Sequence, residues 1–164
     1  MPTFKNRRRL EFTPVQMFDL VADVERYPEF VPLCESLKVN SRENRGDAEI
    51  LVATMGVGYK AIRESFTTRI TMQRKKNEIL VEYLDGPFSH LENRWRFLPS
   101  DEGCEVDFYL DYQFRSRMLA LVMGAVFDKA FAKFSSAFEA RAGKIYRPRR
   151  DALGSPGAPV WLKS

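Results

Sequence analysis

The sequence predicts an α+β protein in which one curved antiparallel sheet of about seven strands wraps around a long C-terminal helix. Three observations lead to this fold class. Strand-like segments joined by short turns fill residues 37–114, a helix start signal follows a first strand, and residues 117–144 contain no proline. The 164 residues fit one domain, residues 1–146, and the Pro- and Gly-rich tail 147–164 is predicted to be disordered.

The chain is expected to begin with one strand and two short helices. Apolar residues of one alternation phase predict the strand over residues 3–12. Thr13 is then a helix N-cap, and Gln16, three residues further on, completes a capping box. Pro28 and Pro32 limit the second helix to about one turn.

Six further segments alternate apolar and polar side chains, as half-buried strands do. The clearest runs from Cys104 to Phe114, where every second residue is apolar. Short turns rich in Gly, Pro and Asn separate the segments, which favours an antiparallel meander. Gly56 and Gly58 are expected to interrupt the pattern. The expected strands span residues 37–43, 48–57, 59–72, 78–84, 91–97 and 104–114.

Residues 117–144 are predicted to form one long helix capped by Ser116. Its second half has a Phe residue at spacings of four, three and four, which favours one buried face. Its first half contains ten consecutive apolar residues, 118–127. Because one sheet covers only one side of a helix, the remaining apolar surface must meet a ligand, a partner, a second copy or a membrane surface.

The inward phase of the strands is rich in aromatic residues, which is consistent either with a solid core or with a ligand cavity between sheet and helix. We predict a cavity whose mouth lies between residues 27–34 and the helix start near residue 118. The candidate polar groups inside it are Thr68, Tyr83, Asn93 and Tyr112, and Glu64 shares their inward phase. The predicted ligand-binding residues are Phe30, Val31, Leu33, Phe66, Tyr83, Phe88, Leu91, Trp95, Phe97, Phe108, Leu110, Tyr112, Met118, Leu121 and Val122.

Motifs for catalysis are scarce. The single histidine, His90, excludes a histidine cluster for a metal, and Cys34 and Cys104 lie 70 residues apart without a CxxC pattern. There is no P-loop, GxGxxG or GxSxG motif. We therefore predict a protein that is not an enzyme and has no catalytic cofactor or metal. A Cys34–His90 pair, or a cyclase or dehydratase in which His90, Tyr83 or Glu64 converge on the cavity, stays an alternative.

The net charge of +4 is unevenly distributed, since residues 147–164 carry four cations and one carboxylate. This argues against a DNA-binding face. A second basic cluster at residues 5–9 is open to three interpretations: simple solvation, anionic lipid or a ribosomal subunit. No apolar run reaches the roughly 20 residues of a membrane span. The predicted location is the cytoplasm, with peripheral contact with the inner membrane left open.

Four segments resemble the coenzyme Q-binding START-domain family, part of the polyketide cyclase/dehydratase and lipid transport superfamily. They are FDLVADVE at 18–25, YPEFVPLC at 27–34, RESFT at 63–67, and GPFSHL at 86–91 followed by WRF at 95–97. The likeness spans about residues 3–145. Where this chain has Leu33, the family often has Trp.

The resemblance implies a helix-grip fold with an apolar tunnel between sheet and helix. It also implies ubiquinone or a related polyprenyl quinone as bound ligand, and a role as a lipid chaperone that supports respiratory electron transport. Bacterial members of the family are described as ribosome association toxins that block joining of the ribosomal subunits. A ribosome-associating inhibitor of translation is therefore the alternative function that the resemblance implies.

Overall fold

The computed structural model describes residues 3–146; the predicted tail 147–164 lies outside the described residues. Seven strands form one antiparallel sheet in the order β1-β7-β6-β5-β4-β3-β2. Every strand pairs with its sequence neighbour except β1, which pairs with β7 at the far edge. The strands are β1 Thr3–Leu10, β2 Cys34–Arg45, β3 Ala48–Tyr59, β4 Ile62–Gln73, β5 Glu78–Asp85, β6 Phe88–Ser100 and β7 Gly103–Phe114.

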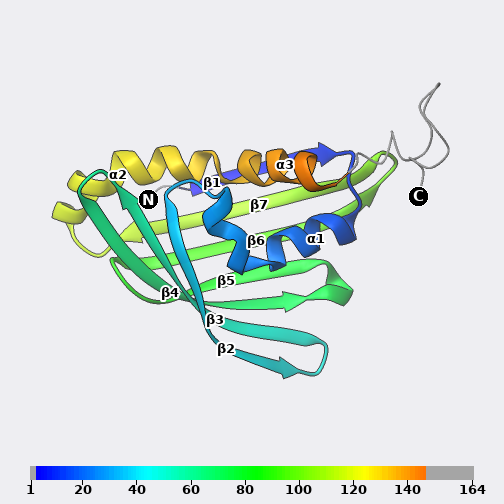
Figure 1. The fold of residues 1–164 in the computed structure, drawn as a ribbon, viewed down its shortest axis with the longest axis horizontal. Helices are drawn as coiled ribbons and strands as arrows, with labels where there is room; N and C mark the ends of the chain where they lie inside the picture. The colour runs from blue at the N-terminus through cyan, green and yellow to red at the C-terminus, as the bar shows by residue number, and fades with distance from the viewer. Residues whose placement is uncertain (1–2, 147–164) are drawn as a thin grey trace.

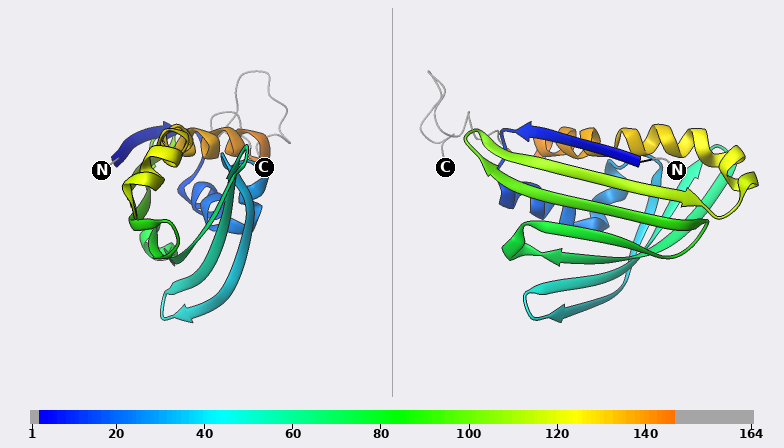
Figure 2. Two further views of the ribbon diagram at one scale, coloured as in Figure 1. Left: turned by 90° about the vertical axis from the view of Figure 1, so that its left-hand side faces the viewer. Right: turned by 180° about the vertical axis from the view of Figure 1, so that it is seen from behind.

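The helices gather on the concave side of this sheet (Figure 1). Viewed from the end, the sheet curls around α1, with α2 and α3 across its opening (Figure 2). The predicted helix-grip arrangement is therefore confirmed. The helices are α1 Pro14–Ala22, the 3-10 helices η1 Val24–Glu29 and η2 Arg74–Lys76, α2 Arg117–Ala132 and α3 Phe134–Ile145.

The predicted capping box at the start of α1 is present. The Gln16 backbone N–H donates to Thr13 Oγ1 over 3.1 Å, and the Thr13 N–H donates to Gln16 Oε1 over 2.9 Å. Pro28 lies inside η1, which is a 3-10 helix. Both short helices after the first strand are thus confirmed, and together they close one side of the concave face.

The curvature of the sheet follows from irregular pairing. The β2–β3 register shifts between Cys34 and Ser36 and again between Val39 and Ser41. Further shifts occur in β4–β5 at Thr67 and in β6. Bulges of this kind bend a strand and increase its twist, so the sheet wraps around the helices rather than lying flat under them.

The prediction that Gly56 and Gly58 interrupt a strand is wrong. Strand β3 runs through both to Tyr59 and turns at Lys60, whose backbone has φ +54°. A Cβ atom on Gly56 would lie 2.3 Å from Ser36 Oγ on β2. The glycine therefore permits two strands to approach each other closely and does not end one of them.

The predicted single helix over residues 117–144 is also wrong at one point. It breaks at Lys133, where the backbone N–H donates to the Ala130 carbonyl over 3.1 Å. The break falls within the three-residue spacing between Phe131 and Phe134. Two shorter helices can follow the curved sheet with their Phe residues inward, which one straight helix cannot do.

Candidate functional site

A cavity of about 60 Å³ lies between the concave face of the sheet and the C-terminal helices. Six strands, β2 to β7, and helices α2, α3 and η1 contribute to its wall. Its lining is Tyr27, Leu37, Met55, Phe66, Thr68, Ile70, Val81, Leu91, Asn93, Trp95, Leu110, Phe131, Phe134 and Phe138. The wall is therefore mostly apolar, with a few polar groups, as in small-molecule sites.

Two side chains supply most of the polar atoms in the wall. Asn93 donates from Nδ2 to the Tyr109 carbonyl over 2.9 Å, and its Oδ1 accepts from Trp95 Nε1 over 2.9 Å. Thr68 on β4 is buried, with 6% of its surface exposed. The second Nδ2 hydrogen of Asn93 and the Thr68 hydroxyl are thus donors beside an aromatic wall.

The wall is closed by aromatic rings from three elements. The Phe138 ring lies 5.2 Å from the ring of Tyr27, 5.0 Å from that of Phe30 and 4.9 Å from that of Trp95. The Tyr27 hydroxyl donates to the Val21 carbonyl, and burial raises the pKa of this tyrosine. The cavity volume of about 60 Å³ has room for about two water molecules, whereas pockets that bind small molecules measure roughly 300–1,000 Å³. A lipid therefore enters only if these rings separate.

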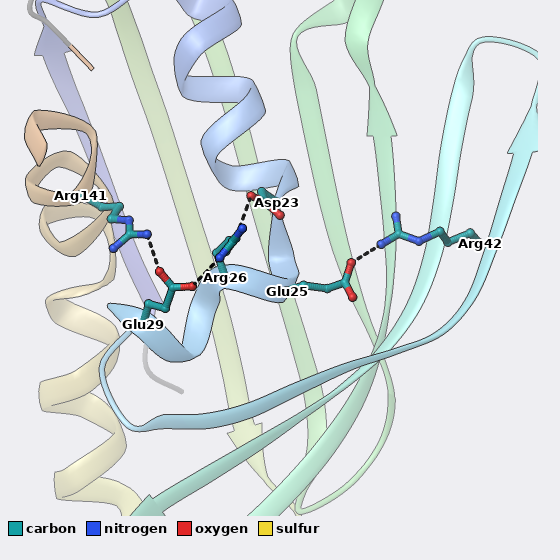
Figure 3. Close-up of polar contacts among 6 residues, drawn as sticks. All are labelled: Asp23, Glu25, Arg26, Glu29, Arg42 and Arg141. Atoms are coloured by element: carbon teal, nitrogen blue, oxygen red, sulfur yellow. Dashed lines mark hydrogen bonds and ion pairs between the residues drawn. The ribbon is translucent and has the colours of Figure 1, made fainter. Parts of the chain in front are cut away.

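Ion pairs hold the lid-like helix η1 to its neighbours (Figure 3). Glu29 Oε1 accepts from Arg141 Nη2 of α3 over 2.6 Å, and Glu29 Oε2 accepts from Arg26 over 3.1 Å. The hydrogen bonds from Arg26 and then Arg141 lower the pKa of Glu29. On the other side, Arg42 of β2 donates to Glu25 over 2.6 Å. Helix η1 is thus connected to both flanks of the cavity.

Four predicted site residues line the cavity: Phe66, Leu91, Trp95 and Leu110. Three more lie around it on the same face of the sheet. The Phe97 ring stacks at 6.1 Å from Trp95, and the Phe108 ring meets Trp95 edge-on at 4.8 Å. The Tyr112 ring lies 4.8 Å from Phe131.

Two predicted residues, Tyr83 and Phe88, form an aromatic cluster under α2 that adjoins the cavity at Phe66. The Tyr83 hydroxyl accepts from the Phe88 N–H over 3.1 Å, and the Phe88 ring lies 5.4 Å from Phe66. At the predicted mouth, Phe30 packs on α3 and Val31 is buried. Leu33 is half-buried with φ +66° and lines a shallow groove outside the cavity.

The expectation that Met118, Leu121 and Val122 face the interior is wrong. These side chains are 74%, 86% and 56% exposed. The buried side of α2 is instead formed by Met123, Phe127, Ala130 and Phe131, which fixes the helical phase and turns the three predicted residues toward solvent. The accompanying prediction, an apolar helix surface that the sheet does not cover, is confirmed.

Leu37 of β2 and Met55 of β3 line the cavity although the sequence reasoning did not select them. Met55 belongs to the alternating series with the buried Ala53 and Val57, so its phase was readable from the sequence. Leu37 lies between two bulges, and its side is set by them rather than by simple alternation.

None of the groups required for a cyclase lines the cavity. His90 Nε2 lies 2.9 Å from Asp111 Oδ2 on the outer face, the Tyr83 hydroxyl is used by Phe88, and Glu64 is partly exposed. The thiol of Cys34 donates to the Ser36 carbonyl over 3.5 Å rather than pairing with His90. Burial raises the pKa of Cys34 to about 11. Among residues 3–146, no cluster of His, Cys, Asp and Glu could hold a metal ion.

A curved sheet, gripped C-terminal helices and an apolar cavity define a START-like ligand-binding protein. The chain belongs to the polyketide cyclase / dehydrase and lipid transport family, whose model matches residues 10–139. The family predicted from the four motifs is thereby confirmed. Within residues 3–146, no helix is both long and apolar enough to cross a membrane.

Named relatives fall into two groups. The ribosome association toxin RatA of Escherichia coli is 33% identical over 150 residues, covering 91% of this chain and 92% of the relative. The mitochondrial coenzyme Q-binding protein COQ10 homolog B of Xenopus laevis is 32% identical over 148 residues, covering 87% of this chain and 59% of the relative.

Solved structures agree on the fold. The solution structure of the 18 kDa protein CC1736 from Caulobacter crescentus superposes with a TM-score of 0.71 at 34% identity, covering 88% of this chain and 98% of that one. The Zhui aromatase/cyclase from a Streptomyces species also reaches a TM-score of 0.71, over 87% of this chain and 94% of that one, but at 14% identity. The second likeness shows a shared fold alone.

Proposed function

We propose that this protein binds ubiquinone or a related polyprenyl quinone between its sheet and helices, without catalysing a reaction, and carries that lipid in support of respiratory electron transport. The observation that carries the proposal is the aromatic cavity with two donors, Thr68 and Asn93, in its wall. A quinone offers carbonyl acceptors on an apolar ring, which suits such donors. The relative named as coenzyme Q-binding supports the choice of ligand.

The driving force is transfer of the prenyl tail out of water, worth about 0.8 kcal/mol for each CH₂ group. This gain has to offset opening of the cavity, because its present volume of about 60 Å³ is too small for the tail. Separation of α3 from η1 enlarges it and breaks the ring contacts of Phe138 with Tyr27 and Phe30. The bound state is thus an opened form of the grip.

The first test is mass spectrometry of lipid extracted from the purified full-length protein, which is expected to contain a quinone. The second is titration of delipidated protein with a ubiquinone carrying two isoprene units, followed by Trp fluorescence. Absence of saturable binding up to the solubility limit of that quinone would contradict the proposal.

A matched pair of variants on β4 tests the position of the head group. Thr68→Val keeps the side-chain shape and removes the inward hydroxyl. The Kd for the quinone is expected to rise about 2- to 12-fold, which corresponds to the net free energy of one hydrogen bond. Thr71→Val makes the same change on the opposite face of the strand, where the side chain is not part of the cavity. Equal effects of the two variants would place the quinone elsewhere.

The second candidate is association with a ribosomal subunit, which the relatives named ribosome association toxin favour. The basic cluster at residues 5–9, which would contact the ribosome in this case, is partly neutralised by ion pairs in the structure. Arg7 lies 2.6 Å from Asp107, and Arg8 bonds Glu139 over 2.6 Å. Arg9 is exposed.

Ribosome profiles separate the two candidates. Overexpression is expected to leave the profile unchanged if the protein is only a quinone carrier. A rise in free subunits that is abolished by changing Arg7, Arg8 and Arg9 to Glu would favour the second candidate. Arg9→Glu alone is the control, because it leaves the ion pairs of Arg7 and Arg8 intact.

A further inference from the structure

The outward face of α2 is the largest group of exposed apolar side chains among residues 3–146. Seven large apolar side chains are prominently exposed among the described residues. Three of them, Met118, Leu121 and Val122, lie on α2 within five positions of one another. With the exposed Ala125, they follow the i, i+3, i+4 and i+7 spacing of one helix face. The other four, on α1, at the end of β3, on β5 and on α3, are scattered singly in the sequence.

This apolar face continues onto the neighbouring turn. Ala125 and Val126 line a shallow groove of about 240 Å³ together with Leu33 and Tyr59. The Gly58 N–H donates to the Leu33 carbonyl over 3.0 Å, which holds the β3–β4 turn beside the loop before β2. The turn reaches toward α2 at one end of the molecule (Figure 1). We call the outward face of α2 and this turn the α2 face.

The rim of the α2 face is basic. Arg115 and Arg117 precede and begin the helix, and Lys129 and Lys133 lie in and after its last turns; all four are exposed. Lys60 is exposed at the tip of the adjacent turn. None of these five cations forms an ion pair with any residue that the structure describes.

The carboxylates near this rim do not neutralise it. From residue 115 to residue 133 the one carboxylate is Asp128, which accepts a hydrogen bond from the buried Tyr112 hydroxyl. The strands of the sheet are different, because most of their arginines form ion pairs. Among the paired cations, Arg7 lies 2.6 Å from Asp107 and Arg96 lies 3.3 Å from Glu78.

We propose that the α2 face docks on an anionic lipid bilayer surface. Met118, Leu121 and Val122 enter the boundary between head groups and acyl chains, and the rim cations lie against lipid phosphates. An apolar face with unpaired cations fits this surface in both respects. A second copy fits worse, because a two-fold contact through this face would place the same cations against one another.

Docking in this orientation brings the cavity close to the lipid phase. Phe131, on the inner side of the same helix, lines the cavity. The break at Lys133 separates the docked helix from α3. The docking proposal stands on the exposed side chains and charges alone and does not require that the cavity bind a quinone.

The test is flotation of the full-length protein with vesicles that contain no quinone, so its outcome is independent of the proposed ligand. One set contains phosphatidylcholine and phosphatidylglycerol, the other phosphatidylcholine alone. Binding to the anionic set is expected, and it should weaken as NaCl is raised. Equal binding to both sets, or binding to neither, would overturn the proposal.

Variants locate the surface. Leu121→Glu with Val122→Glu is expected to weaken vesicle binding about tenfold or more, since burying even one such side chain is worth that factor. Val15→Glu is the matched control, because Val15 on α1 is 57% exposed and Val122 is 56% exposed. Circular dichroism confirms folding of each variant. The proposal would be overturned if the double variant bound vesicles as well as the wild type does, or if Val15→Glu weakened vesicle binding as much as the double variant.

The charge of the rim is tested separately. Arg117→Gln and Lys129→Gln are each expected to weaken binding to the anionic vesicles about fivefold. Lys76→Gln and Lys144→Gln, at exposed positions outside the α2 face, should change it little. Sedimentation equilibrium completes the design: a dimer that the Leu121→Glu, Val122→Glu variant converts to a monomer would assign the face to a second copy and overturn lipid docking.

Discussion

Helices α2 and α3 arise from one uninterrupted helical pattern, yet they are fixed to the protein in different ways. α3 is held by three side-chain bonds to two other elements, β1 and η1. Asn6 Nδ2 of β1 donates to Ser135 Oγ over 2.8 Å, Arg8 of β1 pairs with Glu139, and Arg141 pairs with Glu29 of η1. α2 has a bond from Tyr112 to Asp128 and an N-cap at Ser116. Its outward side presents apolar residues to solvent.

The difference teaches that apolar content alone does not locate a binding cavity. The more apolar helix, α2, turns much of its apolar surface outward, whereas the more polar helix, α3, closes the cavity with Phe134 and Phe138. Polar side chains on the flanks of α3 fix its position on the sheet. We infer that α3 closes the cavity and that α2 makes the contact with the proposed lipid surface.

The largest test of this contrast compares one aromatic residue from α3 with one aliphatic residue from α2. Phe138→Ala removes a ring that contacts Tyr27, Phe30 and Trp95, so the free energy of unfolding is expected to fall by about 3–5 kcal/mol. Leu121→Ala is expected to change it by less than about 0.5 kcal/mol, because the side chain is 86% exposed. Urea unfolding measures both. Similar losses would show that α2 is packed as tightly as α3.

A second comparison removes one polar bond from each helix. Ser135→Ala removes the buried hydroxyl that accepts from the half-buried Asn6 amide and is expected to cost about 1–3 kcal/mol. Tyr112→Phe removes the hydroxyl that donates to Asp128 and is expected to cost about 1 kcal/mol, since the half-buried Asp128 carboxylate can bond water instead. Urea unfolding again gives the values. The opposite order would mean that the Tyr112–Asp128 bond is the stronger attachment.

The difference between the two helices marks the limit of what the sequence predicts. Strand β7 and the capping box at Thr13 were predictable because each depends on residues that are close in the chain. The break at Lys133 was not predictable, because no Gly or Pro marks it in the sequence. It depends on the curvature of the sheet, which bulges far away in the chain produce. The exposure of Met118 has the same origin, since the helical phase is set by contacts with β7.

Four cavity residues, Phe66, Leu91, Trp95 and Leu110, were predictable from strand alternation, because inward phase and burial coincide in regular strands. The small volume of the cavity was not predictable, since it depends on how the Phe138 ring fits against η1. Alternation tells which side chains face inward but not how much space they leave.

The ion pair between η1 and α3 gives a third, smaller test. The bonds from Arg26 and Arg141 lower the pKa of Glu29, so its contribution to stability is present above the ordinary glutamate pKa and is lost as the pH falls through the lowered value. Glu29→Gln is expected to lower the Tm by no more than about 2–4 °C at pH 7, because the pair is exposed. Arg42→Gln, which releases the other flank of η1, is the matched variant.

Acidification supplies the control for this variant. As the pH falls from the ordinary glutamate pKa of 4.5 through the lowered pKa of Glu29 in the folded protein, the difference in Tm between wild type and Glu29→Gln should shrink, because Glu29 becomes protonated first in the unfolded and then in the folded chain. A difference that does not shrink as the pH is lowered would assign the effect to side-chain packing rather than to charge.

The smallest expected effect comes from glycines in the two helices. A Cβ atom added to Gly124 of α2 or Gly143 of α3 meets no atom within 4 Å, so each Gly→Ala change acts through helix propensity alone, worth up to about 1 kcal/mol. Gly143 lies near the end of α3, where the gain should be smaller. If α2 opens locally while α3 stays attached, Gly124→Ala slows hydrogen exchange in α2 while global unfolding hardly changes. An equal gain in local and global stability would instead mean that α2 and α3 unfold as one unit, and the two helices would then share one role.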